Sequence, residues 1–159
     1  MNLKDYIRSI ENYPKKGILF RDITTLIKNE KAFEETINQI VERSRKFKVD
    51  KIAAIESRGF VFASAVSYIL KKPFIMLRKK NKLPADVHSV DFQLEYGTAT
   101  IEVHKDSISE NDSILIIDDL IATGGTAEAA TKLVEISKGK VAAFIFVINL
   151  FDLGGCENL

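Results

Sequence analysis

The sequence predicts an α/β protein with a central, largely parallel β-sheet flanked by helices. Short apolar runs rich in β-branched residues occur at 51–55, 73–77, 114–117 and 141–148, and such runs are typical of strands buried on both faces. Helix-like stretches separate several of them, and this alternation is typical of parallel sheets. At 159 residues and 46% hydrophobic content the chain is long enough for one real core.

The N-terminal segment 1–30 is expected to carry little regular structure. Leu3, Ile7 and Ile10 are spaced like one face of a short helix. Residues 19–23 are expected to be irregular or briefly extended. We treat this segment as a small hood attached to the single domain 1–159, because no linker or repeat marks a boundary.

Three helices are expected around the sheet. Apolar residues recur at helical spacing over 31–46, which predicts an amphipathic helix. The second helix, 60–70, is almost wholly apolar, so its sequence fits either core packing or an interface between two copies. The third, 127–137, follows the strand at 114–117.

The periodic pattern weakens over residues 78–94, which hold several charges and Pro84. This stretch is expected to be a long flexible loop, and loops of that length are often functional lids. Residues 93–95 and 98–103 are predicted to form a hairpin around Tyr96 and Gly97. The flexible loop and hairpin together span 78–103.

Charge and composition exclude several classes of partner. The 23 basic and 22 acidic residues nearly cancel, so nucleic acid and anionic membrane are not expected partners. The longest strongly apolar stretch, 141–148, is too short to cross a bilayer. Cys156 is the only cysteine, so no internal disulfide is expected, as is usual in the cytoplasm.

The stretch 113–126 offers the parts of a sugar-phosphate site. Asp118 and Asp119 come where the apolar strand is expected to end, and Gly124 and Gly125 precede a helix. Ligands of parallel sheets bind at the carboxyl ends of the strands, and a helix N-terminus favours phosphate. Carboxylates beside it suit ribose hydroxyls or Mg²⁺, although an acidic strand end that merely faces water is the simpler alternative.

Residues 116–126, Ile-Ile-Asp-Asp-Leu-Ile-Ala-Thr-Gly-Gly-Thr, closely resemble the phosphoribosyl-pyrophosphate signature of the type I phosphoribosyltransferases. Four other blocks resemble the adenine-specific branch of that family: 13–24, 56–60, 78–84 and 94–98. The resemblance implies the type I phosphoribosyltransferase fold, with the N-terminal hood and the flexible catalytic loop described above.

The implied reaction transfers the 5-phosphoribosyl group from phosphoribosyl pyrophosphate to adenine and gives AMP and pyrophosphate. Mg²⁺ is the implied cofactor, held mainly through the substrate rather than directly by side chains. Three residues are implied in catalysis. Glu95 would act as general acid or base near purine N7, and Asp118 and Asp119 would bind the ribose hydroxyls.

The substrate-binding residues implied by the resemblance fall into groups. The base is expected against Leu19, Phe20 and Arg21, and Tyr96 would help close the site. Pyrophosphate is expected against Glu56, Ser57, Arg58, Gly59, Arg78, Lys79 and Lys82, with a cis peptide between Glu56 and Ser57. The 5′-phosphate is expected against Ala122, Thr123, Gly124, Gly125 and Thr126.

Two other functions fit the sequence. One is a phosphoribosyltransferase for xanthine, guanine or hypoxanthine, because backbone groups that read the base leave no trace in side-chain identity. The other is a sensor that binds phosphoribosyl pyrophosphate without catalysis, although neither the basic surface nor the added domain of a DNA-binding regulator is expected here. The resemblance also implies a homodimer and a cytoplasmic location.

Overall fold

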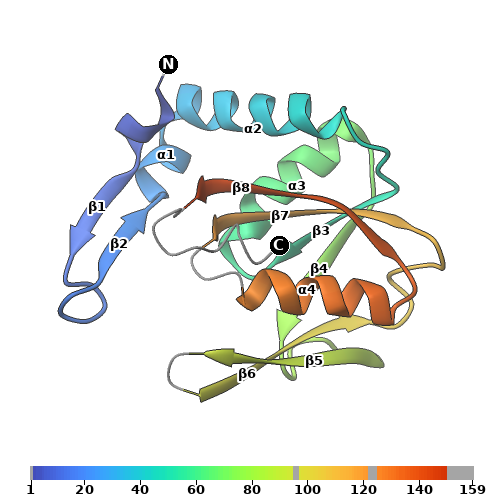
Figure 1. Cartoon of the computed structure of the whole chain (residues 1–159). Coiled ribbons are helices and arrows are strands. Elements are labelled where there is room, and N and C mark those ends of the chain that lie inside the picture. The colour runs from blue at the N-terminus through green and yellow to red at the C-terminus, as the bar shows by residue number, and fades with distance from the viewer. Residues whose placement is uncertain (1, 95–96, 122–124, 150–159) are drawn as a thin grey trace. The chain divides into compact units, whose positions relative to one another are not determined.

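The computed structural model of the chain describes residues 2–94, 97–121 and 125–149 (Figure 1). These residues group into two compact units, 1–42 and 43–159. The hood expected over 1–30 falls within the first unit. Each unit is described by itself.

The first unit is built around a small antiparallel hairpin. Its elements are a 3₁₀ turn Leu3–Tyr6, strands β1 Arg8–Glu11 and β2 Leu19–Asp22, helix α1 Thr24–Lys28 and most of helix α2 Glu30–Ser44. Ile10 pairs with Phe20 across the hairpin. The short helix expected from Leu3, Ile7 and Ile10 is therefore wrong beyond Tyr6, because three apolar residues are too few to separate helical from extended spacing.

One carboxylate fastens this hairpin to the helix that follows. Asp22 is 6% exposed and accepts hydrogen bonds from the backbone N–H and the hydroxyl of Thr24, at 2.9 and 2.7 Å. It also pairs with Arg8 across the hairpin. These hydrogen bonds from Thr24 and Arg8 lower the pKa of Asp22 to about 2.

The second unit is a six-stranded mixed sheet in the order β5-β6-β4-β3-β7-β8. The four strands from β4 to β8 in that order run parallel, and β6 and β5 continue the sheet antiparallel. The strands are β3 Lys51–Ile55, β4 Phe74–Lys79, β5 Val87–Leu94, β6 Gly97–His104, β7 Ser113–Ile121 and β8 Lys140–Asn149.

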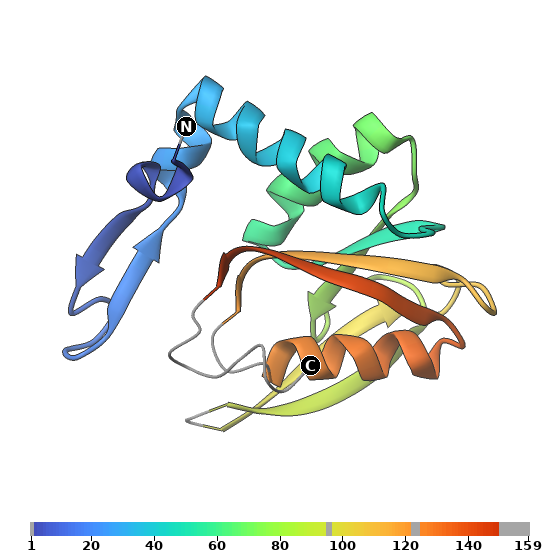
Figure 2. The ribbon, with the colours of Figure 1, turned by 45° about the horizontal axis from the view of Figure 1, so that its top comes forward.

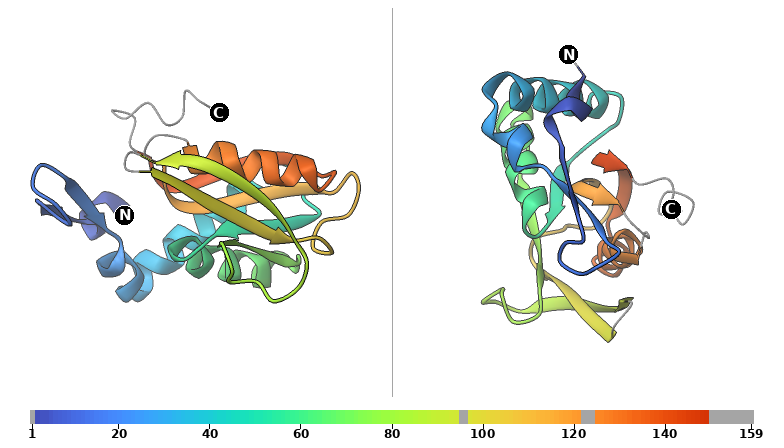
Figure 3. Two further views of the ribbon diagram at one scale, coloured as in Figure 1. Left: turned by 90° about the horizontal axis from the view of Figure 1, so that it is seen from below. Right: turned by 90° about the vertical axis from the view of Figure 1, so that its left-hand side faces the viewer.

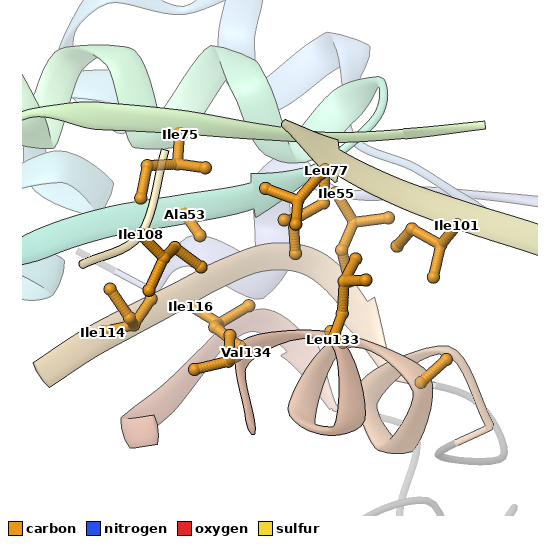
Figure 4. Packing of buried hydrophobic residues seen from close by; sticks show 13 residues of the cluster. Ala53, Ile55, Ile75, Leu77, Ile101, Ile108, Ile114, Ile116, Leu133 and Val134 are labelled. Carbon is orange, nitrogen blue, oxygen red and sulfur yellow. The ribbon is translucent and has the colours of Figure 1, made fainter. Parts of the chain in front are cut away.

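Helices α3 Arg58–Leu70 and α4 Gly125–Ile136 cover opposite faces of the parallel strands (Figures 2 and 3). Alternate residues of each strand face each helix. On the α4 face, Ile114 and Ile116 of β7 pack against Leu133 and Val134 (Figure 4). The opposite face buries Phe62 of α3 completely, so the central strands are apolar on both sides, as the sequence predicts.

Two expectations from the sequence are wrong in this unit. Strand β7 does not end at residue 117 but continues through Asp118 and Asp119 to Ile121. Residues 87–92, expected to lack regular structure, belong to β5, which pairs along its whole length with β6. The hairpin expected from 93–95 and 98–103 is therefore much longer than predicted. The side chains of this edge strand alternate between half-buried and exposed, and the polar outer residues weaken the apolar signal.

In the part of the chain that the structure describes, no helix is long and apolar enough to cross a membrane.

Candidate active site

The acidic pair, Asp118 and Asp119, lies near the end of β7, beside the start of α3. Asp119 is 5% exposed, and its backbone N–H donates a hydrogen bond of 2.8 Å to Asp118 Oδ1. Successive strand residues point to opposite faces of a sheet. Although the two residues are adjacent in sequence, their side chains therefore have different surroundings.

Burial raises the pKa of the Asp118 carboxyl well above its ordinary value, and the neighbouring Asp119 carboxylate raises it further. Like charges placed close together cannot both ionise cheaply. The positive charge of Arg58 acts in the opposite direction but is the smaller effect. A cation or a set of hydroxyl donors at this position would relieve the cost of ionising Asp118.

Arg58 and Gly59 at the start of α3 fix the position of the acidic pair. Arg58 Nε lies 2.9 Å from Asp119 Oδ2. A Cβ at residue 59 would lie 3.0 Å from Asp118 Oδ1 and 3.1 Å from the Ile117 carbonyl oxygen. Only glycine lets the helix approach β7 this closely without displacing the carboxylate.

The turn between β3 and α3 has the cis peptide bond expected between Glu56 and Ser57. The Glu56 side chain contacts other residues of the protein. Its Oε1 accepts a hydrogen bond of 2.6 Å from the Lys79 backbone N–H and lies 3.5 Å from Arg78 Nε. The two sequence blocks expected to bind pyrophosphate, 56–59 and 78–82, therefore meet at this carboxylate.

A cavity of about 670 Å³ lies beside this meeting point. Its walls come from four places: the end of β3, the end of β4 with the basic turn after it, the β5–β6 hairpin, and the start of α4. The residues lining it are Ile55, Glu56, Leu77, Arg78, Lys79, Lys80, Lys82, Phe92, Leu94, Thr98, Ala99, Thr100, Ile101 and Thr126. A volume of this size accommodates a nucleotide-sized ligand, and its basic wall favours an anionic one.

The N-terminus of α4 borders the same cavity. Thr126 is one of the lining residues, and Gly125 is the first residue of the helix. Free backbone N–H groups and the helix dipole favour a phosphate at such a helix start. The other residues expected to bind the 5′-phosphate, Ala122, Thr123 and Gly124, lie outside the described residues.

The residues expected to hold the base lie on β2, in the first unit. Phe20 makes an edge-to-face contact with Tyr13, with ring centroids 5.1 Å apart. The guanidinium of Arg21 donates a hydrogen bond of 2.6 Å to Ser9 Oγ. Leu19 is 47% exposed and so is available for a contact outside its own unit.

The structure thus brings together the expected pyrophosphate residues, the acidic pair and the start of α4 within the second unit. Glu95 and Tyr96 lie outside the described residues. Sequence reasoning missed the β5–β6 wall of the cavity, including Phe92 and Thr100, and the buried carboxylate of Glu102. A charged residue between two apolar ones in a strand, as at 101–103, is the signal that was available.

No three His, Cys, Asp or Glu side chains come together as a metal cluster anywhere within residues 2–94, 97–121 and 125–149. Asp118 and Asp119 do offer carboxylate oxygens of the kind that Mg²⁺ prefers. These carboxylates therefore fit a Mg²⁺ ion nearby that would be held mainly through the substrate.

The second unit has a mostly parallel sheet, an acidic pair on β7, and a cavity bordered by a basic wall and the start of a helix. Together these features define a sugar-phosphate enzyme. The family model described as phosphoribosyl transferase domain matches residues 22–151, so the chain belongs to the phosphoribosyltransferase family. Within that family it is similar to adenine phosphoribosyltransferases. The one from Pelagibacter ubique is 82% identical over 159 residues, covering 100% of this chain and 91% of the relative.

Solved structures of adenine phosphoribosyltransferases have the same fold. The one from Thermoanaerobacter pseudethanolicus is 44% identical, with a TM-score of 0.95 over 98% of this chain and 90% of its own. The one from Saccharomyces cerevisiae, in complex with adenine and an imino-altritol bisphosphate, is 34% identical, with a TM-score of 0.93 over 99% and 92%. These comparisons confirm the type I phosphoribosyltransferase fold.

Proposed function

We propose that this protein is a purine salvage enzyme that transfers the 5-phosphoribosyl group of phosphoribosyl pyrophosphate to adenine, giving AMP and pyrophosphate. The observation that carries the proposal is the full-length similarity to adenine phosphoribosyltransferases, at 82% identity in one relative. The cavity supports it, because its cationic side chains and the start of α4 suit the phosphate groups of such a substrate. The acidic pair on β7 offers acceptors for the ribose hydroxyls.

The acidic pair and the start of α4 are proposed to hold the ribose phosphate. Asp118 and Asp119 accept hydrogen bonds from the ribose hydroxyls, and their negative charge stabilises cationic character that develops at C1. Ala122, Thr123, Gly124, Gly125 and Thr126 hold the 5′-phosphate through backbone N–H groups and hydroxyls.

The basic wall is proposed to hold pyrophosphate. Arg78, Lys79 and Lys82 offset the charge that gathers on the leaving group. Glu56, Ser57, Arg58 and Gly59 form the neighbouring turn. Arg58 Nε is paired with Asp119, and because a guanidinium has five N–H donors, Arg58 is proposed to contact pyrophosphate while keeping that pairing.

Adenine binding and proton transfer are assigned to the remaining groups. Leu19, Phe20 and Arg21 contact the base, Glu95 exchanges a proton near purine N7, and Tyr96 helps to exclude water. Mg²⁺ would be held by substrate oxygens with Asp118 and Asp119 nearby, and it would neutralise charge on the pyrophosphate.

We place the enzyme in the cytoplasm as a homodimer. A single cysteine in 159 residues fits a reducing compartment. The homodimer is supported by α3, which buries Phe62 and Val66 yet leaves Val61, Tyr68 and Ile69 at 39%, 76% and 46% exposure. The sequence leaves core packing and an interface open as alternatives for this helix. The buried side of α3 fits core packing, and its exposed side fits an interface.

A base screen tests the activity. The purified protein is incubated with phosphoribosyl pyrophosphate, Mg²⁺ and one of adenine, hypoxanthine, guanine, xanthine or orotate, and nucleotides are separated by chromatography. We expect rapid formation of AMP from adenine only. Product from an oxopurine would overturn the assignment of adenine, and phosphoribosyl pyrophosphate binding without product from any base would identify a sensor.

A further inference from the structure

The basic residues at the cavity lie on a tight turn that follows β4. We call residues 79–82 the lysine turn, because it carries Lys79, Lys80 and Lys82, all of which line the cavity. The Lys82 N–H donates to the Lys79 carbonyl oxygen at 3.3 Å, and Asn81 has φ of 67° in the left-handed region. Close like charges repel, so this turn needs something to hold its shape.

Two carboxylates hold the backbone of the lysine turn at different points. Glu56 accepts from the Lys79 N–H at 2.6 Å, and Glu102 Oε1 accepts from the Asn81 N–H at 2.9 Å. Glu56 comes from the turn after β3, whereas Glu102 comes from β6 in the antiparallel part of the sheet (Figure 1). The turn is thus tied to both sides of β4.

Glu102 is unusual for a charged residue because it is only 7% exposed. It sits in the middle strand of the trio β5-β6-β4, with Arg78 as its Cα partner on β4 and Ser89 on β5. The Ser89 hydroxyl donates to Oε2 at 2.5 Å. Burying a carboxylate costs free energy unless its oxygens accept hydrogen bonds, and here each oxygen accepts one.

We propose that Glu102 is a positioning residue, which holds the lysine turn in the conformation that receives the pyrophosphate group of the substrate. The inference rests on the proposed role of residues 78–82 in binding pyrophosphate. A turn that is already in place loses less conformational freedom when the anion binds. Removing the carboxylate leaves the Asn81 N–H without this acceptor and lets the lysines spread apart.

The test compares three substitutions at one position. Glu102→Ala removes both hydrogen bonds, Glu102→Asp keeps the charge but shortens its reach, and Glu102→Gln keeps an acceptor for Asn81 and offers its amide N–H to Ser89. Calorimetry with pyrophosphate and Mg²⁺ measures affinity. Initial rates give KM for phosphoribosyl pyrophosphate and for adenine, and thermal melting monitors folding.

We expect Glu102→Ala and Glu102→Asp to weaken pyrophosphate binding about tenfold, the size of losing one hydrogen bond to a charged group. The KM for phosphoribosyl pyrophosphate rises in parallel while the KM for adenine stays unchanged. Glu102→Gln keeps both values within about twofold of the wild type, because the amide oxygen still accepts from the Asn81 N–H and the amide N–H donates to Ser89 in place of the bond that Ser89 donates. A Glu102→Gln protein as weak as Glu102→Ala would overturn the proposal.

His104→Ala is the matched control. His104 lies two residues further along β6, and its Nε2 accepts a hydrogen bond of 3.2 Å from the Ala85 N–H, beyond the lysine turn. We expect this variant to keep the wild-type affinity for pyrophosphate. An equal loss in His104→Ala would overturn the proposal, because general loosening of residues 80–86 would then explain both.

Failure of the inference and failure of the proposed function give different results. If the wild-type protein makes no AMP, the proposed function fails, while calorimetry with pyrophosphate still ranks the Glu102 variants. If AMP forms but all three variants bind pyrophosphate like the wild type, the role of Glu102 is overturned and the function stands. If Glu102→Ala does not fold, Glu102→Asp carries the same comparison.

Discussion

At the scale of single residues, the acidic pair should make the stability of the protein depend on pH. Burial and the neighbouring Asp119 carboxylate disfavour the charged form of Asp118 and raise its pKa from 3.8 to about 8. Between pH 3.8 and about pH 8, the folded protein keeps a proton on Asp118 that the unfolded chain releases. Its free energy of unfolding therefore falls as pH rises, by at most about 1.4 kcal/mol per pH unit for one proton.

Asp118→Asn should remove this slope. We expect the melting temperature of the wild type to fall between pH 5 and pH 8 and that of Asp118→Asn to change less, so the variant gains relative stability at pH 8. Calorimetric melting in matched buffers measures both. Asp106→Asn, which removes an exposed carboxylate in the loop after β6, is the control and should keep the wild-type slope. An unchanged slope in Asp118→Asn would contradict the assignment.

Gly59 lies where any side chain would contact β7. Gly59→Ala gains about 1 kcal/mol of helix propensity, but its Cβ would meet Asp118 Oδ1 at 3.0 Å and the Ile117 carbonyl oxygen at 3.1 Å. Overpacking costs about 1–3 kcal/mol, so the clash outweighs the gain. We expect a lower melting temperature and a loss of kcat/KM of about tenfold or more, because a small displacement of a positioned group is costly in catalysis.

Ser64→Ala provides the comparison for Gly59→Ala. Ser64 is exposed on the same helix, and its hydroxyl donates only to the Val61 carbonyl oxygen at 3.2 Å. This variant should keep wild-type activity. A Gly59→Ala enzyme with wild-type kcat/KM would show that Asp118 can move without consequence for the reaction.

At the scale of elements, α3 carries the prediction about assembly. Val61, Tyr68 and Ile69 recur at helical spacing on its exposed side, and a Tyr with 76% exposure has a large apolar area to bury. We expect Tyr68→Asp to shift the protein from dimer to monomer at micromolar concentration, as measured by sedimentation equilibrium. Burying an unpaired carboxylate in the interface is the physical reason.

An exposed apolar residue on the other helix tests whether the effect is local. Ile136 is 50% exposed at the end of α4, so Ile136→Asp makes the same chemical change on the opposite face of the sheet. We expect this variant to remain dimeric. A wild-type protein that sediments as a monomer would refute the proposed homodimer.

At the scale of the whole molecule, the sequence predicts the parallel core well because strong local signals and burial agree there. The strand at Lys51–Ile55 is predicted at its observed bounds, and helix α3 differs from prediction only at its start. The acidic pair is expected where the strand ends, but the strand runs on to Ile121. Pairing with β8 carries it past the carboxylates, and pairing is a tertiary effect.

The parts that the sequence does not predict depend on contacts between distant residues. Strand β5 is specified by its register with β6, since its own residues alternate too weakly. The role of Glu102 becomes visible only when Asn81, Ser89 and the lysine turn are brought beside it. The pairing of Arg58 with Asp119 likewise joins residues far apart in the sequence, one at the start of α3 and one on β7.

The pairing of β3 with β7 has a consequence for how the protein folds. Asp50, the residue before β3, and Ser113, the first residue of β7, exchange hydrogen bonds of 2.8 Å although they are 63 positions apart in the sequence. Long-range pairing of this kind raises the contact order. Proteins rich in such pairing fold slowly, because the intervening chain loses conformational entropy on closing before the stabilising contacts form. Helices α3 and α4 can form early, but the two carboxylates of β7 reach their neighbours Arg58 and Gly59 only after that closure. The ability to bind the ribose phosphate should therefore appear late in refolding, together with the sheet and not with the helices.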